Sequence, residues 1–344
     1  MGLAGLVVLA TVVLAGGSSQ AADPSRTQVF ANLARKVAVP EYENLATTTA
    51  SLQQAMTTLC ASNTPATFDA ARAAWLDASE AWNRTRVFRF GPTFTVSHIT
   101  FPIDPAKIEN LAAGSQPAIG PPFTPDSLLQ TGAEVRGLEA IEYVLYTGTV
   151  TPATCSLASA AAQLAASTAA EVAEAWTTGT NGAAPFAQQL ANPKRSEMYE
   201  NEQQALDDIV NGMLLVSSEA TSALANTLLP TPGRMRATVH TGTRVQDNLA
   251  AVQAAWLGTT KGKGGNGVGS LVASVSPTSA ERTSDTLDKA VRAASKLPER
   301  LSDASPAELR ATYRYVRNLT RQLDAEVATQ LGVTINLSDV DGDS

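Results

Sequence analysis

The densest group of side chains that could do chemistry lies in the run EVRGLEAIEYVLY, residues 134–146. On a helix, Glu139 and Glu142 stand three residues apart and project from neighbouring positions on one side. Two carboxylates so close repel each other unless a cation or a shared proton relieves them, and a hard metal ion would do so. The run therefore predicts a metal site with Glu139 and Glu142 as its acidic ligands and Arg136 as their charge partner.

Two further residues of the run belong to the same predicted site. Tyr143 lies on the polar face beside the carboxylates, and Gly137 has no side chain, which leaves room for another helix or a ligand. A plainer interpretation stays open, because most Glu-x-x-Glu pairs on helices are solvated. Arg136 and Glu139 would then form an ordinary i,i+3 ion pair.

Single residues elsewhere in the chain could complete the site. Glu80 lies between Trp75 and Trp82 and could supply a third carboxylate from a facing helix, or could simply face solvent. The chain has 2 histidines. His98 precedes the run in a long loop and could supply an imidazole, or could have no role. His240 lies on a second-half helix that could face the first half and add polar groups to a cleft.

The composition indicates which elements must position these residues. Apolar residues make up 44% of the chain and charged residues 17%, which is enough to bury a core. Aromatic residues are only 5% and alanine is abundant, which favours close-packed helices over sheets. The net charge is -7, which argues against nucleic acid as a partner because phosphate binding needs clustered basic residues.

Helical periodicity recurs in both halves of the chain. The expected helices are residues 42–60, 68–90, 126–146, 152–176, 196–229, 236–257, 277–297 and 306–331. Residues 91–125 are expected to be a long irregular segment, and residues 178–193 contain the best domain boundary. The pattern predicts an all-α fold of two packed four-helix-bundle-like domains, residues 23–180 and 181–344. The repeated sequence AAWL at 73–76 and 254–257 suggests an internal duplication.

The N-terminus indicates the compartment. Residues 2–16 are almost wholly apolar and small polar residues follow, which predicts a signal peptide over residues 1–22 and export to the periplasm or beyond. No later segment is apolar for long enough to make the chain an integral membrane protein. The chain has 2 cysteines, and in an exported protein Cys60 and Cys155 could form one disulfide. Two unpaired buried thiols are the alternative.

The sequence offers little for other kinds of catalysis. It contains no G-x-S-x-G and too few histidines for a serine triad to be assembled. H-E-x-x-H is absent, which disfavours a standard zinc protease, and a dinucleotide-binding fingerprint is absent as well.

The run GLEAIEYVLY, from Gly137 to Tyr146, resembles the signature helix of the imelysin family (M75 peptidase-like, iron-regulated protein A-like proteins). That signature is G-x-H-x-x-E followed by an aromatic and apolar residues. Gly137 and Glu142 match it, whereas Glu139 stands where the histidine belongs. An imidazole with a carboxylate suits zinc or iron, while two carboxylates favour harder ions.

Other stretches of the chain are similar to the same family. Residues 71–92 look like its second helix and the loop that follows, and Ile103-Asp104 stands where the family has a short segment before the signature helix. Residues 154–176 look like its Cys-containing helix, and the terminus LGV…DGD looks like its end.

The resemblance implies two helical bundles, export and an association with iron uptake. Our first hypothesis is a protein that binds a metal ion, with iron implied, or a metal-bearing ligand in an interdomain cleft, alongside another exported or membrane uptake component. The second is an M75-type metallopeptidase, which Glu139 in place of histidine disfavours. The third is a non-catalytic scaffold that binds another exported protein.

Overall fold

In the computed structural model, every regular element of the described residues is helical, so the predicted all-α class is confirmed. The described residues are 24–92, 94–115, 119–180, 182–230, 239–262 and 264–336. The predicted signal peptide and the DGD terminus lie outside them. The predicted duplication remains a prediction.

The first half packs around one long helix. Helix α1 (Arg26–Leu33) continues through a π-helical segment (Ala34–Ala38) into α2 (Val39–Ala61), which packs against both α3 (Pro65–Thr85) and α7 (Pro152–Thr177). Thr64 and Thr151 cap α3 and α7 with their side chains, each followed by a proline that fits the first helical turn. A disulfide joins Cys60, at the end of α2, to Cys155, at the start of α7.

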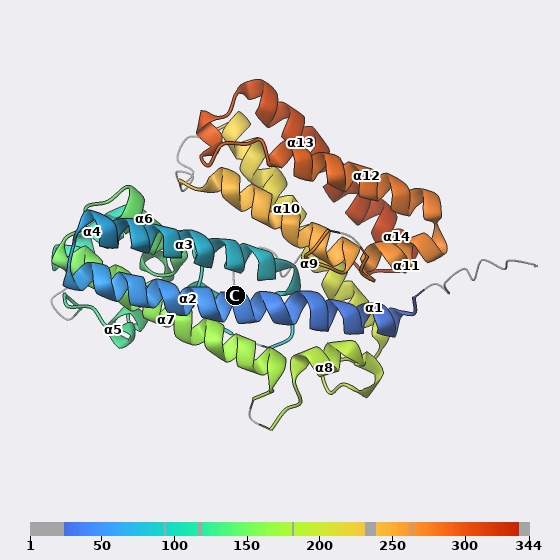
Figure 1. Ribbon diagram of the computed structural model, residues 1–344, viewed down its shortest axis with the longest axis horizontal. Coiled ribbons are helices and arrows are strands. Elements are labelled where there is room, and N and C mark those ends of the chain that lie inside the picture. Colours follow the sequence, from blue (N-terminus) through green and yellow to red (C-terminus); the bar gives the residue numbers. More distant parts are fainter. Residues whose placement is uncertain are drawn as a thin grey trace, which may run out of the picture.

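The second half is built on helices from α9 onward. Helix α9 (Glu202–Leu228) packs against α10 (Thr241–Leu257) and α13 (Pro306–Arg321), and α12 (Pro277–Ala294) covers α13 and α10. Helix α11 (Val268–Val275) packs on α12, and α13 continues through a second π-helical segment (Gln322–Val327) into α14 (Ala328–Leu331). Figure 1 shows these helices, coloured yellow to red, as a group beside the blue and green helices of the first half.

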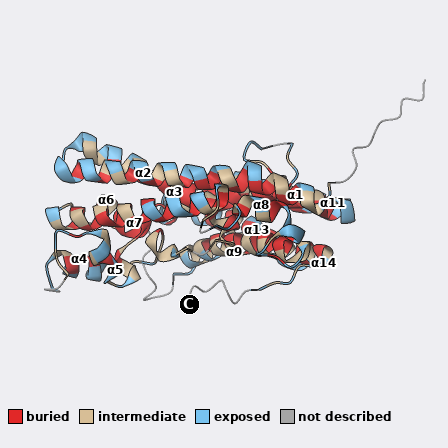
Figure 2. Cartoon of the chain, turned by 90° about the horizontal axis from the view of Figure 1, so that it is seen from below, coloured by how far each residue is buried: buried red, intermediate tan, exposed pale blue. Residues whose placement is uncertain are grey.

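The two halves make direct contact through helices. Helix α10 packs along α3, and α9 packs against the 3-10 turn Arg86–Phe88 that ends α3. A Cβ on Gly212 of α9 would lie 2.0 Å from the Val87 carbonyl oxygen, so glycine is needed for this close approach. Buried residues line the faces that the helices turn toward one another (Figure 2).

The proposed division of the chain into residues 23–180 and 181–344 stays a prediction about folding units. Helix α8 (Phe186–Ala191) follows the predicted boundary but packs against α1 and α7 of the first half. Phe186 stacks edge-on against Trp176, the last large residue of α7, at a centroid distance of 4.7 Å.

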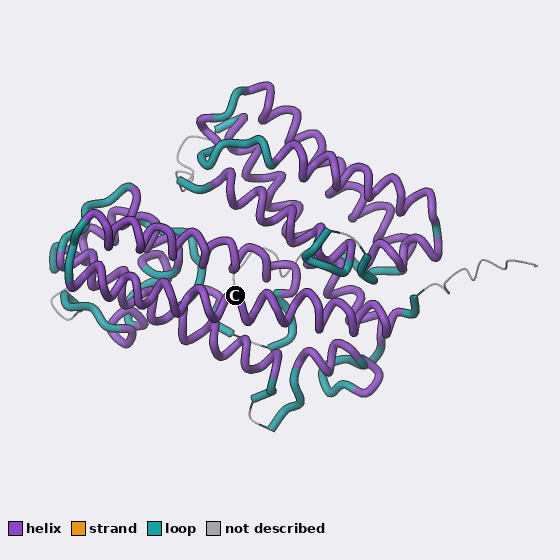
Figure 3. Tube along the Cα trace, viewed as in Figure 1, coloured by secondary structure: helices purple, strands orange, loops and turns teal. Residues whose placement is uncertain are grey.

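The segment around the predicted site folds differently from the expectation. The predicted irregular stretch 91–125 contains a further helix, α4 (Pro105–Ala112). The expected single helix over 126–146 is wrong: it divides into α5 (Pro125–Leu129), a 3-10 turn (Ala133–Val135) and α6 (Leu138–Tyr146). Figure 3 shows the loops that separate these short helices at one end of the first bundle.

Candidate functional site where α6 meets α10

Gly137 fixes the start of α6. Its φ is 83°, a value that favours glycine, and a Cβ there would lie 3.0 Å from the carbonyl oxygen of Ile99. The next residue, Leu138, donates its backbone N–H to that same oxygen at 2.7 Å. This turn, which the long-helix prediction missed, aims the first two turns of α6 at the second half of the chain.

Glu139 is held by three donors. Its Oε1 accepts from the Thr100 hydroxyl at 2.6 Å, its Oε2 accepts from the Phe101 backbone N–H at 3.2 Å, and Arg244 of α10 lies 3.5 Å from Oε1. Both carboxylate oxygens therefore have partners within the protein. The charge partner comes from the other half of the chain.

The expected helical ion pair between Arg136 and Glu139 is wrong. Arg136 lies before α6 in extended backbone, so the two residues do not share a helix. Its guanidinium donates to the Leu128 carbonyl oxygen at 3.4 Å, on the outer side of the turn. Burial lowers the pKa of Arg136, and Glu134 partly offsets this.

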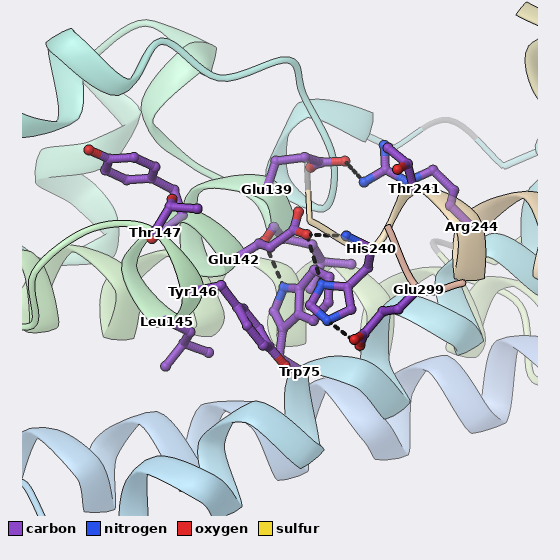
Figure 4. Close-up of polar contacts among 12 residues, drawn as sticks. Trp75, Glu139, Glu142, Leu145, Tyr146, Thr147, His240, Thr241, Arg244 and Glu299 are labelled. Atoms are coloured by element: carbon purple, nitrogen blue, oxygen red, sulfur yellow. Dashed lines mark hydrogen bonds and ion pairs between the residues drawn. The ribbon is translucent and has the colours of Figure 1, made fainter. Parts of the chain in front are cut away.

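Glu142 binds His240, which stands directly before α10. Oε1 of Glu142 accepts from the His240 backbone N–H at 3.0 Å and lies 2.9 Å from the ring nitrogen Nδ1 (Figure 4). The two side chains are only 2% and 3% exposed. Oε2 of Glu142 is buried and has no hydrogen-bond partner among the described residues.

The second ring nitrogen of His240 faces Glu299. Nε2 lies 2.7 Å from Oε1 of Glu299, yet this contact does not meet hydrogen-bond geometry, so buried Nε2 lacks a well-directed partner in the described part of the chain. The distance establishes proximity, and the poor alignment argues against a strong hydrogen bond. The Glu299 side chain is 57% exposed, so it can move without leaving a cavity.

A tight backbone contact holds Glu299 beside the start of α10. The Gly242 N–H donates to the Glu299 carbonyl oxygen at 2.8 Å, and Leu301 N–H donates to the Thr241 hydroxyl at 3.2 Å. A Cβ on Gly242 would lie 1.9 Å from the Pro298 carbonyl oxygen. These contacts fix the position of the loop that carries Glu299 relative to His240.

Two aromatic rings enclose the imidazole. The ring centroids of Trp75 and Tyr146 lie 4.7 Å and 4.3 Å from that of His240. The Trp75 indole donates to the Leu138 carbonyl oxygen at 2.8 Å, which ties α3 to the start of α6. Burial raises the pKa of Tyr146 to about 12, so its phenol is neutral near pH 7. The two rings cover the imidazole, and its buried Nε2 edge lies beside Glu299.

Other residues that the sequence proposed for the site lie elsewhere. Asp104 caps α4, where its side chain accepts from the backbone N–H of Ala106 at 3.0 Å. The Tyr143 hydroxyl donates to Glu109 of α4 at 2.9 Å. Asp104 caps a helix and Tyr143 ties two helices together, and the sequence pattern did not distinguish these roles from a role in the site.

His98 does not supply the missing imidazole in this structure. Its Nδ1 lies 3.1 Å from the Thr168 hydroxyl on α7, and burial, followed by Arg136, lowers its pKa. The imidazole beside Glu142 comes from His240 instead. The structure thus brings the second-half helix of His240 onto the first half, as the sequence suggested it could.

Glu80 belongs to a different acidic group. It forms an i,i+4 ion pair with Arg84 at 2.7 Å on α3, with 47% of its side chain exposed. Its negative charge acts on Glu41 of α2 and on Asp247 of α10. Burial, and then Glu80, raises the pKa of Asp247 to about 6, and burial also raises that of Glu41. We call Glu41, Glu80 and Asp247 the acidic group.

The geometry sets conditions on a metal ion. In the described ranges, no three Asp, Glu, His or Cys side chains are grouped as a metal ion would need. Glu142 and Glu299 lie at opposite nitrogens of one ring, so in this conformation they cannot both bind the same ion as His240. Where α6 meets α10, Glu142 Oε2 and His240 Nε2 are both buried without a hydrogen-bond partner among the described residues.

The sequence model of the imelysin family, peptidase M75, matches residues 38–330. This chain belongs to the imelysin family. Among curated proteins, iron-regulated protein A of Synechococcus elongatus is 33% identical over 150 residues, which is 42% of this chain. The match spans 38% of that relative's length, well under two thirds.

Two crystal structures share the fold of this imelysin-family chain. One is a Parabacteroides distasonis protein assigned as an iron-regulated protein A precursor, with a TM-score of 0.75 at 16% identity, covering 91% of this chain and 97% of that one. The other is an imelysin-like protein of Psychrobacter arcticum, with a TM-score of 0.66 at 18% identity, covering 90% and 96%. At such identities the likeness establishes the fold alone.

The site contains an imidazole, although α6 lacks the histidine of the family signature. Glu139, at the signature's histidine position, binds Arg244, while Glu142 binds His240. Two features of the sequence could have indicated His240. The chain has few histidines, and the histidine of the family signature is replaced by Glu139. Glu299 carried no such signal, because an isolated surface-type glutamate in a loop is common. No described helix is long and apolar enough to cross a membrane.

Proposed function

We propose that this imelysin-family chain is an exported protein that captures a metal ion, iron being the favoured cargo, at the Nε2 edge of His240. Glu299 would be the second ligand, and Glu142 would orient the imidazole. The observation that carries the proposal is the pair of buried polar atoms without a well-directed partner, Glu142 Oε2 and His240 Nε2.

Glu142 prepares the ring for a ligand role. Its Oε1 accepts from the backbone N–H of His240, and Nδ1 lies at 2.9 Å, which favours the tautomer with hydrogen on Nδ1. The lone pair then resides on Nε2. A carboxylate behind a ligating histidine fixes ring orientation and raises ligand basicity.

Glu299 supplies a movable oxygen ligand. With hydrogen on Nδ1, His240 Nε2 and Glu299 Oε1 are both acceptors, and at 2.7 Å they repel each other. Either a proton on Nε2 or a cation relieves this repulsion. Because the side chain is largely exposed, a rotamer change could open the space that an ion needs between Nε2 and Oε1. An imidazole with a carboxylate and water suits iron, zinc or manganese better than calcium.

The proposal gives Glu139 a role different from the one the sequence suggested. Its oxygens already accept from Thr100 and Phe101, and Arg244 neutralises its charge. We propose that Glu139 holds α10 in place and that Glu142 is the member of the signature pair that acts on the ion.

Export and iron are supported by independent features. The apolar segment 2–16, the disulfide between Cys60 and Cys155, and a structural relative described as a precursor all support export. The names of the two iron-regulated relatives support iron as the metal to test first.

Metal binding can be measured directly by titration calorimetry and elemental analysis, with Fe(II) under anaerobic conditions, Mn(II) and Zn(II). Glu299→Gln should weaken binding at least about tenfold, since it removes a charged ligand without touching the buried core. Glu142→Gln should weaken it by about 10- to 100-fold, as changes behind a ligating histidine do.

Glu80→Gln is the matched control, because it removes one partly exposed carboxylate of the first half outside the site. Its affinity should equal that of the unaltered protein. The proposal fails if none of the three ions binds, or if Glu299→Gln and Glu80→Gln bind them equally well.

A further inference from the structure

Four arginines form a single row on the exposed side of α13. Spaced four, three and four residues apart, they share one helix face, and they are Arg310, Arg314, Arg317 and Arg321. The opposite face is buried in the second bundle, through Leu309, Thr312, Val316 and Leu319. We call these four side chains the arginine row.

The arginine row places like charges next to each other. Arg310 and Arg314 are i,i+4 neighbours, Arg314 and Arg317 are i,i+3, and Arg317 and Arg321 are i,i+4. Such like-charge pairs destabilise a helix. Within the described residues, no ion pair relieves any of the four.

On the neighbouring helix α12, by contrast, basic residues are paired with acidic ones. Lys289 pairs with Asp285 at 2.6 Å, and Arg292 lies 3.8 Å from Asp288, each with the acidic residue four positions earlier. This is the arrangement that stabilises an exposed helix. At the same i−4 positions, the arginines of α13 have proline, arginine, tyrosine and arginine.

A solvated face does not explain this contrast. The chain is acidic, with 32 Asp and Glu against 25 Lys and Arg, so carboxylates were available to balance the row. Where a natural sequence breaks a local rule without a compensating contact, the site is more often functional. None of the described residues supplies such a contact, and an anionic partner would.

We propose that the arginine row binds the surface of an anionic phospholipid membrane. From Arg310 to Arg321 the row covers 12 residues, or about 16 Å along the helix axis. Helix α13 lies at the outer edge of the second bundle (Figure 1), and all four arginines are exposed. A flat array of phosphate headgroups can meet all four guanidinium groups at once, and each can form paired hydrogen bonds with phosphate.

An acidic peptide fits this face less well. Peptide recognition draws on a groove and on apolar anchors beside the charges. Ala307 and Asn318, exposed near the arginines, are small or polar, and Tyr315 is a single large exposed side chain on this helix. A membrane surface needs no groove and no inserted apolar group. The contact should therefore be electrostatic and peripheral, and salt should weaken it strongly.

Vesicle co-sedimentation of the full chain tests the proposal. Vesicles of phosphatidylcholine alone are compared with vesicles that also contain about 30% phosphatidylglycerol, which gives them an anionic surface. The test variant is Arg310→Gln/Arg314→Gln/Arg317→Gln/Arg321→Gln. The matched control is Arg282→Gln/Lys289→Gln/Arg292→Gln/Lys296→Gln, which removes the same amount of positive charge from α12 and the residues after it.

Binding to the anionic vesicles should be clear at low salt and lost at about 0.5 M salt. The arginine-row variant should bind at least about tenfold more weakly, and the α12 control within about twofold of the unaltered protein. Circular dichroism should show both variants folded. Because the N-terminal segment is the same in all three proteins, it cannot produce this difference.

Three outcomes would overturn the proposal. Equal binding by the arginine-row variant and the unaltered protein would show that the row is not the contact. Absence of binding to anionic vesicles at low salt would remove the membrane as partner. Binding of polyglutamate without binding to vesicles would assign the row to an acidic polypeptide instead.

Discussion

Two groups of carboxylates lie where the halves of this protein meet, and they have different partners. At the junction of α6 with α10, Glu142 has His240 and Glu139 has Arg244, so each carboxylate meets a basic residue of the other half. In the acidic group, the described residues give Asp247 a long contact of 3.5 Å with the Asn83 amide, and Glu80 adds a like charge that Arg84 and Arg244 partly offset. Burial therefore raises the pKa of Asp247 to about 6, well above its usual range.

The difference separates carboxylates with a basic partner beside them from one whose pKa is raised by burial. A carboxylate with a dedicated base can stay ionised when buried, and an ionised, oriented carboxylate is what a histidine needs behind it to bind a metal. A buried carboxylate without such a base becomes protonated instead. The α6–α10 junction is thus the better candidate for cation binding, and the acidic group is better suited to set how stability depends on pH.

The largest effect should follow from removing the base at the junction. His240→Ala leaves the Glu142 carboxylate buried with one backbone N–H as its remaining partner, and should lower the free energy of unfolding by about 3–5 kcal/mol. Urea denaturation followed by circular dichroism measures this. His98→Ala is the control, since that ring is partly exposed and its hydrogen-bond partner among the described residues is the Thr168 hydroxyl, and it should cost under about 1 kcal/mol.

A double-mutant cycle sharpens the result. Adding Glu142→Gln to His240→Ala removes the uncompensated charge and should recover part of the lost stability. Equal costs for His98→Ala and His240→Ala would mean that Glu142 does not depend on its histidine. The contrast between the two carboxylate groups would then be lost.

The turn that aims α6 at α10 gives the next largest effect. Gly137 has a φ of 83° and ψ of -176°, a conformation that is essentially restricted to glycine. Gly137→Ala adds a Cβ at 3.0 Å from a backbone oxygen, and should cost about 2–3 kcal/mol and weaken metal binding as well. Gly114→Ala, at φ 73° with no atom within 4 Å of the new Cβ, should cost only about 1 kcal/mol. If the two alanine variants are equally stable, the close approach to Ile99 does not matter.

Sequence reasoning predicted the helical class and most helix positions because periodic apolar residues and capping Ser or Thr before proline are local signals. The expected helices over 42–60 and 152–176 correspond to α2, Val39–Ala61, and α7, Pro152–Thr177. The turn at Gly137 was missed because the apolar periodicity runs through it, while its cause is a hydrogen bond to Ile99, far away in the chain.

The site was only half predictable for the same reason. Glu139 and Glu142 were found from their spacing on one helix, which is local information. Their partners Arg244 and His240 come from a helix about a hundred residues later, as the separation of 98 residues between Glu142 and His240 shows. Side chains such as Asp104 and Tyr143 look equally suited to a site in sequence, and only packing shows that they cap or tie neighbouring helices.

In the acidic group, the raised pKa of Asp247 predicts that the free energy of unfolding depends on pH. A carboxyl whose pKa is raised in the folded state binds its proton more tightly than in the unfolded chain, so folding stability falls as pH rises from about 4 to about 6. Asp247→Asn cannot ionise and should remove this fall, with a gain of up to about 2 kcal/mol near pH 7 and little change below pH 4. Urea denaturation across this pH range measures it. A variant that is less stable than the parent at every pH would show that Asp247 is held as an ion.

The smallest effect should come from the exposed member of the acidic group. Glu80→Gln removes a like charge that raises the pKa values of Asp247 and Glu41, but it also removes the surface ion pair with Arg84. Because Glu80 is half-exposed, solvent screens both contributions, and the net change in unfolding free energy should be within about 0.5 kcal/mol. The informative quantity is the pH dependence. The fall in stability should end at slightly lower pH, because the folded-state pKa values of Asp247 and Glu41 would be raised less, and 0.5 M salt should largely abolish the difference from the unaltered protein. An end at higher pH would mean that the charge of Glu80 does not raise the pKa values of the two buried carboxylates.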